Sequence, residues 1–218
     1  TFLSVKVNVT IEQANNAGTN TTKNTCKNTA SFDLFALLGT GVTTGGVWSF
    51  NGTNRPNSNF NPAVDVTGDY KYTIPASGVC PELFSIVTVN NYDIPTLPIT
   101  PITDLKVCDD ATDGSDTNGQ TAFNLTTKTT EALNGQTGVV VTYHLLENDA
   151  KADINAITSY SGPNRIIYVR LENTTTTCYN TTSFNVVVNP LPVIDNDVIL
   201  KQCDDDTDAI SDFNLTEA

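Results

Sequence analysis

Apolar and polar residues alternate along several stretches of the chain, which is the pattern of β-strands that bury one face. In residues 139–145, for example, Val139, Val141 and Tyr143 fall on the same face. The strands predicted from this pattern and from β-propensity are residues 32–38, 47–50, 69–74, 83–90, 139–145, 165–171 and 183–189. Turn residues such as Asn134-Gly135 separate them, so we expect short antiparallel strands.

Two short stretches have a helical composition. Residues 129–133 lead to Gly135, and residues 148–154 contain two alanines and a lysine. Neither is long enough to be more than a single crossover turn. The pattern therefore predicts an all-β chain with two helical turns.

The sequence also repeats itself. Cys-Asp-Asp at 108–110 is followed by Phe-Asn-Leu-Thr at 123–126. Cys-Asp-Asp returns 95 residues later, at 203–205, and is again followed by Phe-Asn-Leu-Thr, at 213–216. A more divergent copy begins at Cys26. Because a unit of about 80 to 100 residues is large enough to enclose its own core, we predict tandem domains.

The repeat divides the chain into five parts. These are the last strand of a preceding repeat (residues 1–10), a first repeat (11–94), a Pro-containing linker (95–103), a second repeat (104–192) and the start of a truncated third repeat (193–218). Each complete repeat has a cysteine early and another before its last strand, which favours an immunoglobulin-like antiparallel β-sandwich. Proline-spaced connectors are stiff and extended, so the array should be elongated.

The chain is acidic, with 24 Asp and Glu against 11 Lys and Arg and a formal net charge of −13. An acidic chain without basic clusters argues against nucleic acid or an anionic membrane as a partner. No apolar run approaches the ~20 residues that span a membrane, and the sequence does not begin with a signal peptide. We expect any anchor or export signal to lie outside this sequence.

The five cysteines are assigned from the repeat. Cys26 opens the first unit and Cys80 precedes its last strand, as Cys108 and Cys178 do in the second unit. Equivalent positions predict two intradomain disulfides, Cys26–Cys80 and Cys108–Cys178, each worth about 4 kcal/mol in the chain-entropy model. Cys203 should then be unpaired because its unit is truncated. Reduced thiols or a metal site are the alternative, but no Cys-x-x-Cys hook exists. Paired cysteines imply an oxidising compartment.

The acidic segments after Cys108 and Cys203 are the strongest chemical candidates. Interleaved Asp and Asn oxygens with glycine offer the hard oxygen ligands that calcium prefers. The candidate ligands are Asp109, Asp110, Asp113, Asp116, Asp204, Asp205, Asp206 and Asp208. The alternative is a solvated turn whose side chains accept from local backbone N–H groups. The first repeat has Lys27 where the second has an aspartate, so calcium could not serve every unit.

Catalytic chemistry is not indicated. His144 is the only histidine, which excludes multi-histidine metal sites and leaves any triad without a second base. The alternation that buries Tyr143 should place His144 on the solvent face. No nucleophile elbow or phosphate-binding loop is present, so we expect no enzyme. Trp48 takes the place of Tyr143 in the first repeat and is predicted to pack on the core disulfide, with ligand stacking as the alternative.

The units also resemble a known family. The residues that carry the resemblance are 108–110, 123–125, 141–145, 167–179 and 184–192, with residues 45–49, 60–63 and 70–73 similar to a second repeat type of the same proteins. They resemble repeats of very large surface proteins of Bacteroidota, which include the mobile adhesins of gliding bacteria exported by type IX secretion. The resemblance implies a filamentous cell-surface adhesin built from immunoglobulin-like domains. It identifies no binding residue.

We therefore expect a segment of a long extracellular adhesin or surface filament, acting as a stalk and multivalent array in attachment or gliding. The expected partners are neighbouring repeats of the same chain and extracellular surfaces or glycans. Anchoring or motility machinery would be engaged by regions outside this sequence. The main alternative is a carbohydrate-binding or spacer region of a secreted hydrolase, and a structural surface layer is a third possibility.

Overall fold

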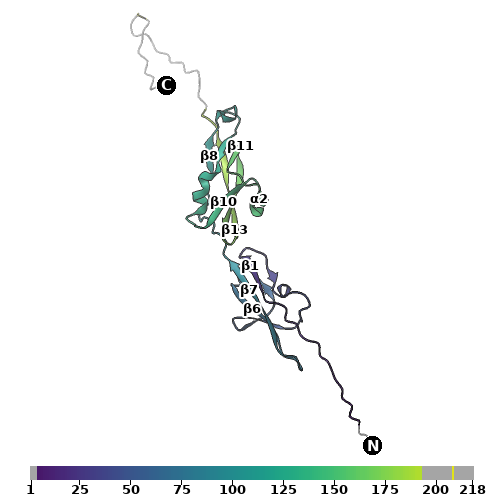
Figure 1. Ribbon diagram of the computed structural model, residues 1–218. Coiled ribbons are helices and arrows are strands. Elements are labelled where there is room, and N and C mark those ends of the chain that lie inside the picture. The colour runs from purple at the N-terminus through teal and green to yellow at the C-terminus, as the bar shows by residue number, and fades with distance from the viewer. Residues whose placement is uncertain (1–3, 193–207, 209–218) are drawn as a thin grey trace.

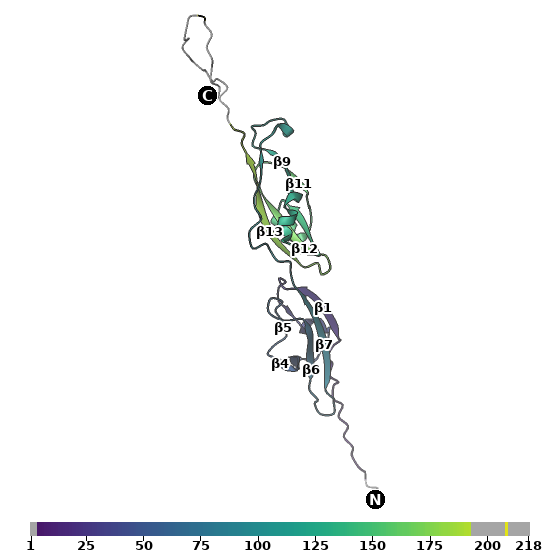
Figure 2. The ribbon, with the colours of Figure 1, turned by 90° about the vertical axis from the view of Figure 1, so that its left-hand side faces the viewer.

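The computed structural model describes residues 4–192 and Asp208. Two β-rich domains lie end to end along one axis (Figures 1 and 2). Domain 1 contains the elements β1 to β7, and domain 2 contains the elements β8 to β13. The predictions for Cys203 and for Asp204, Asp205 and Asp206 lie outside the described residues.

Domain 1 is built on a five-stranded sheet in the order β1-β7-β6-β3-β4, faced by the strand pair β2-β5. Its strands are β1 (Thr21–Cys26), β2 (Phe32–Asp33), β3 (Val47–Phe50), β4 (Thr53–Arg55), β5 (Asn59–Phe60), β6 (Gly68–Ile74) and β7 (Leu83–Tyr92), with one 3₁₀ turn, η1 (Phe35–Leu38). Strand β7 shows the predicted alternation: every second residue from Ser85 to Asn91 is buried.

Domain 2 is built on a four-stranded sheet in the order β10-β12-β13-β8, faced by the pair β11-β9. Its strands are β8 (Leu105–Cys108), β9 (Thr121–Asn124), β10 (Val139–His144), β11 (Ser159–Gly162), β12 (Arg165–Asn173) and β13 (Tyr179–Asn189). Its helical elements are η2 (Ala111–Asp113), η3 (Leu125–Lys128), α1 (Thr129–Leu133) and α2 (Glu147–Ala152). The two helical turns expected from the sequence are α1 and α2.

Both domains are all-β and immunoglobulin-like, and they share one strand plan. The first strand of each domain pairs with the last strand in parallel, β1 with β7 and β8 with β13. The last strand then pairs antiparallel with the strand before it, β6 in domain 1 and β12 in domain 2. The parallel pair brings the ends of the first and last strands to the same end of the domain, which decides where the cysteines lie.

Each domain has its own hydrophobic core. In domain 1, Trp48, Tyr70 and Tyr72 from the large sheet pack with Leu34 and Phe60. The core of domain 2 contains apolar residues from both sheets and from the linker, namely Ile102, Phe123, Leu125, Ala132, Tyr143, Ile167, Val169, Leu171, Phe184 and Val186. Because neither core needs residues of the other domain, the contact between them is a separate structural feature.

Three local predictions were wrong. The stretch 32–38 is a strand only at β2 and then forms η1. Leu34 and Leu38 are buried while Ala36 between them is exposed, which fits a helical turn and not a strand. Residues 4–10 form no strand, and Val5 and Val7 are largely exposed. Their place in a preceding unit stays a prediction. His144 is fully buried instead of facing solvent.

Candidate functional site: the disulfide-linked domain junction

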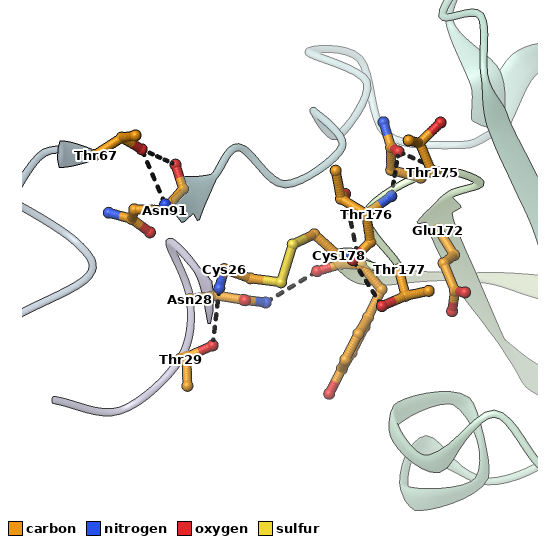
Figure 3. The surroundings of a disulfide bond; sticks show 12 residues. Cys26, Asn28, Thr29, Thr67, Asn91, Glu172, Thr175, Thr176, Thr177 and Cys178 are labelled. Atoms are coloured by element: carbon orange, nitrogen blue, oxygen red, sulfur yellow. Dashed lines mark hydrogen bonds between the residues drawn. A yellow bond between two sulfur atoms is a disulfide. The ribbon is translucent and has the colours of Figure 1, made fainter. Parts of the chain in front are cut away.

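A disulfide joins the two domains. Cys26, at the end of β1 in domain 1, is bonded to Cys178, which directly precedes β13 in domain 2. Their Cα atoms are 5.6 Å apart, and 152 residues separate them in the sequence. Figure 3 shows the bond crossing from the strand of one domain to the loop of the other. The junction therefore has a covalent link in addition to the linker.

Cys26 is held at the edge of domain 1 by the parallel pairing of β1 with β7. In this register Cys26 lies opposite Tyr92, the last residue of β7. The Thr29 N–H donates to the Cys26 carbonyl over 2.9 Å, which closes a turn directly after the cysteine. The end of β7 is fixed in turn, because the Asn91 backbone exchanges two hydrogen bonds with Thr67 Oγ1, at 2.9 and 3.1 Å.

Cys178 is presented by the tight loop between β12 and β13. The Asn173 side chain organises this loop, since its Oδ1 accepts from the backbone N–H groups of Thr175 and Thr176 at 2.9 and 3.0 Å. Thr177, directly before the cysteine, has a φ of +60°, a left-handed conformation that a threonine rarely adopts. Cys178 itself is fully buried. The loop thus directs the buried sulfur of Cys178 toward domain 1.

Hydrogen bonds support the disulfide from both sides. Asn28, two residues after Cys26, donates from Nδ2 to the carbonyl of Tyr179 over 2.9 Å. This is a direct contact between the domains (Figure 3). Asn180 Nδ2 donates to the carbonyl of Pro95 in the linker over 3.1 Å. Residues that closely follow each cysteine therefore fix the relative position of the two domains.

The linker is also attached to domain 2. Thr96 and Gln136 form a reciprocal pair, in which the Thr96 N–H donates to Gln136 Oε1 at 2.9 Å and Gln136 Nε2 donates to the Thr96 carbonyl at 2.8 Å. Further along, Glu131 accepts from the Thr103 N–H at 2.5 Å. This hydrogen bond is the largest cause of the lowered pKa of Glu131, and the neighbouring Lys128 adds to it. The predicted stiff linker is thus held at both ends.

A buried arginine supports the hairpin that carries Cys178. The Arg170 side chain is 7% exposed and lies 3.6 Å over the ring of Tyr179. Its guanidinium pairs with Glu172 and donates to the carbonyls of Ala150 and Lys151 in α2, each at 3.1 Å. A planar guanidinium can make these contacts together because its donors point in fixed directions. Arg170 therefore ties α2 to both strands of the hairpin.

The intradomain pairing predicted for the cysteines was wrong. Cys26 lies beside the end of β7, whereas Cys80 precedes the start of that ten-residue strand. At about 3.3 Å per residue the two are on the order of 30 Å apart, far beyond the reach of a disulfide. The same holds for Cys108, which lies opposite Asn189 at the far end of β13 from Cys178.

Cys80 and Cys108 are the free cysteines of the described chain. Sequence reasoning missed this because it matched the order of the cysteines without recognising the strands that precede Cys26 and Cys108. A parallel pair of first and last strands puts those cysteines at the end of the domain opposite Cys80 and Cys178. Recognising β1 and β8 would have excluded the pairing.

The burial of Trp48 and of His144 decides the predictions made for these two side chains. Trp48 is 5% exposed and packs on Tyr72 with ring centroids 5.2 Å apart, so it neither lies on a disulfide nor offers a face to a ligand. His144 is held between the carbonyl of Ile154, 2.8 Å from Nδ1, and Thr142 Oγ1, 2.9 Å from Nε2. Both are core residues.

The acidic segment of domain 2 forms a turn in which two aspartates satisfy backbone donors. Asp109 is buried, and its Oδ2 accepts from the Gly119 N–H at 2.7 Å. Asp110 is exposed and caps η2; hydrogen bonds from Thr112 lower its pKa. Asp116 and Asp208 are exposed. In the part of the chain that the structure describes, no three acidic, histidine or cysteine side chains are grouped to hold a metal ion. Calcium binding stays a prediction, which melting curves with and without a chelator would test.

Comparison with family models gives a match within domain 2. Residues 104–192 match the family model of the Flavobacterium inter-domain disulphide bond domain. The match covers domain 2, which is less than half of the chain. Cys178 lies inside the matched range, and its partner Cys26 lies outside it, in domain 1. Domain 2 is therefore similar to a bacterial domain named for the kind of bond found here.

Solved structures that resemble the chain include tandem immunoglobulin-like domains. Extracellular domains 3–5 of Drosophila OTK are 12% identical with a TM-score of 0.32, covering 78% of this chain and 60% of that one. A three-domain titin segment is 10% identical with a TM-score of 0.33, covering 79% and 64%. Immunoglobulin domains 1–4 of Sidekick-1 are 8% identical with a TM-score of 0.32, covering 77% and 47%.

The chain thus spans about half to two thirds of the length of these structures. No curated protein matches the chain. Within residues 4–192, no helix is long and apolar enough to cross a membrane. Tandem immunoglobulin-like domains with a disulfide between them have the features of an extracellular stalk or spacer.

Proposed function

We propose that the chain is a load-bearing segment of a long extracellular adhesin or surface filament of a Bacteroidota-type bacterium. In this proposal the immunoglobulin-like units hold a binding region away from the cell, or present many weak contacts whose avidity adds. The observation that carries the proposal is the disulfide between Cys26 and Cys178. A bond between domains is not part of the packing of either core, but it fixes the position of one domain relative to the other.

The position of the disulfide suits a chain under tension. Force that enters along β1 reaches Cys26, crosses the disulfide and continues along β13. The residues between the two cysteines, which include most of both cores, lie outside this covalent path. They cannot be pulled out while the bond is intact, because a covalent bond resists extension far more than hydrogen bonds do.

The linker contacts serve the same purpose. In an ordinary tandem array the connector is a hinge, since interdomain interfaces are small and polar. Here the linker is bound to domain 2 through the reciprocal Thr96–Gln136 pair, and Asn28 bridges the domains directly. We therefore propose that the two domains move as one stiff rod. The disulfide supports an oxidising, extracellular location.

The rod is tested by comparing two single-cysteine variants in solution. Cys26→Ser removes the interdomain bond, whereas Cys80→Ser removes a thiol that is free in the structure. Small-angle X-ray scattering should give one elongated shape for the wild type and for Cys80→Ser. The Cys26→Ser variant should show a broader distribution of interatomic distances, because its domains can bend about the linker.

Equal scattering curves for all three proteins would contradict the proposal that the bond sets the stiffness. Non-reducing peptide mapping of the same samples must recover the Cys26–Cys178 peptide from the wild type and from Cys80→Ser. Loss of Cys26 must leave each domain folded, which far-ultraviolet circular dichroism checks.

A further inference from the structure

The two free cysteines lie at opposite ends of the two-domain unit. Cys80 is in the loop between β6 and β7, and this loop lies at the end of domain 1 that points away from domain 2 (Figure 1). Cys108 ends β8, at the end of domain 2 that points away from domain 1. Cys80 is partly exposed and Cys108 is exposed. Neither is buried as a core residue.

Each free cysteine occupies the same position in its domain as one member of the disulfide. Cys26 and Cys108 both lie opposite the last residue of the final strand, Tyr92 in one domain and Asn189 in the other. Cys80 precedes Tyr92 by 12 residues, and Cys178 precedes Asn189 by 11. Each of the two domains thus has one cysteine at the end that faces a following unit, here called the outgoing end. The other cysteine lies at the end that faces a preceding unit, the incoming end.

We propose that Cys80 and Cys108 are the two halves of further interdomain disulfides. Cys108 would bond to the cysteine before the last strand of a unit that follows, and Cys80 to the first-strand cysteine of a unit that precedes. This inference rests on the proposed function as a tandem array. The partner is in each case an immunoglobulin-like unit of the same chain. The observed junction is the template, because it joins the same two positions.

The sequence after domain 2 contains the start of such a unit. Residues 200–203 read Leu-Lys-Gln-Cys where residues 105–108 read Leu-Lys-Val-Cys, and Cys-Asp-Asp follows in register. Cys203 therefore corresponds to Cys108 in the sequence repeat. It is not the predicted partner of Cys108. That partner is the equivalent of Cys178, roughly 70 residues further along, the distance from Cys108 to Cys178.

Bond formation follows thiol–disulfide exchange. One cysteine thiolate attacks the disulfide of a dithiol–disulfide oxidant and forms a mixed disulfide, which the second thiolate then displaces. The two protein thiols lose two electrons and two protons in total, and the oxidant leaves as its dithiol. The incoming-end cysteine of the observed junction is fully buried once bonded, so we expect the other bonds to be similarly shielded.

The consequence is a filament with two covalent load paths. One path runs through β1 to Cys26, crosses to Cys178 and continues along β13. The other runs from Cys80 along β7, the linker and β8 to Cys108. In each domain the two paths are the parallel-paired strands, β1 beside β7 and β8 beside β13. Each path crosses a domain along a single strand, so the loops closed by the disulfides are not extended.

An extended chain tests the proposal. It consists of residues 1–202 followed by a second copy of residues 108–192, so that the native linker leads into a complete third unit. After oxidation with a glutathione redox buffer, non-reducing peptide mapping should recover two bonds. These are Cys26 to the first Cys178, and the first Cys108 to the Cys178 of the second copy.

The outcomes separate this inference from the function on which it rests. Recovery of the Cys26 bond with the first Cys108 still reduced overturns the inference alone. Absence of both bonds overturns the proposed function as well, and so does any pairing within one domain. A version of the extended chain with Cys108→Ser in the first copy only must keep the Cys26 bond and leave the Cys178 of the second copy reduced. Any other partner for that cysteine also contradicts the proposal.

Discussion

At the scale of single residues, the side chains that matter most are those that fix a backbone rather than those that could react. Asn28 joins the domains through one amide, and Asn173 shapes the loop that presents Cys178. Asparagine is suited to both tasks because one short side chain both donates and accepts hydrogen bonds. The sequence shows that asparagine is abundant, but not which residues face a neighbouring domain.

Loss of the Asn28 contact should make the disulfide easier to reduce. An Asn28→Ala variant loses a hydrogen bond worth about 0.5–1 kcal/mol, so we expect reduction by dithiothreitol to be about threefold faster. The control is Asn24→Ala, which removes a hydrogen bond to Asn90 inside domain 1. Thiol trapping over time measures both, and equal rates in the two variants would show that Asn28 does not protect the bond.

The carboxylate of Glu131 predicts a pH dependence for domain 2. The Thr103 N–H and Lys128 hold its pKa below its ordinary value of 4.5. A group whose pKa is lowered on folding adds stability above its unfolded pKa, and this stability is lost as the pH falls through the folded pKa. We therefore expect Glu131→Gln to reduce the free energy of unfolding at pH 7 by about 1 kcal/mol.

Below the folded pKa of Glu131 the difference between variant and wild type should disappear. Thermal melts at pH 7 and at about pH 3 measure this difference. Glu147→Gln is the matched control, because Glu147 pairs with Lys151 at the exposed surface of α2 and exposed pairs contribute little. A Glu131→Gln difference that is the same at both pH values would contradict the assignment.

At the scale of elements, strand positions were predicted correctly where apolar and polar residues alternate or where turn residues mark the strand ends. Strands β3, β6, β7 and β10 were predicted within two residues, because each alternates or follows clear turn signals. The prediction of strands failed for β1, whose sequence Thr-Thr-Lys-Asn-Thr-Cys is polar nearly throughout. Its strand character comes from the pairing with β7 and not from a buried face of its own. The missed strand is the reason for the wrong disulfides.

The hairpin of β12 and β13 depends on Arg170. An Arg170→Lys variant keeps the charge but cannot reach Glu172, Tyr179 and the carbonyls of α2 together. We expect domain 2 to lose about 2 kcal/mol of stability. Urea unfolding measures it, with Arg165→Lys as a control at a largely exposed site on the same strand. Equal loss in both variants would show that the buried contacts of Arg170 add nothing.

At the scale of the whole molecule, two separate cores are joined by a bond that closes a loop of 152 residues. In the chain-entropy model such a loop is worth about 5 kcal/mol, but its mechanical effect is larger than its thermodynamic one. The covalent path between the ends of the chain omits everything between Cys26 and Cys178. A stalk made this way transmits force without lengthening.

Single-molecule extension of the chain from its two ends tests this claim most directly. Only the residues before Cys26 and after Cys178 can extend in the oxidised protein, so we predict a full extension of about 230 Å. Addition of a reductant should release about 530 Å more as both cores become accessible. An oxidised length of about 330 Å would fit bonds within each domain, and about 760 Å would fit no bond at all. Either result would contradict the proposed load path.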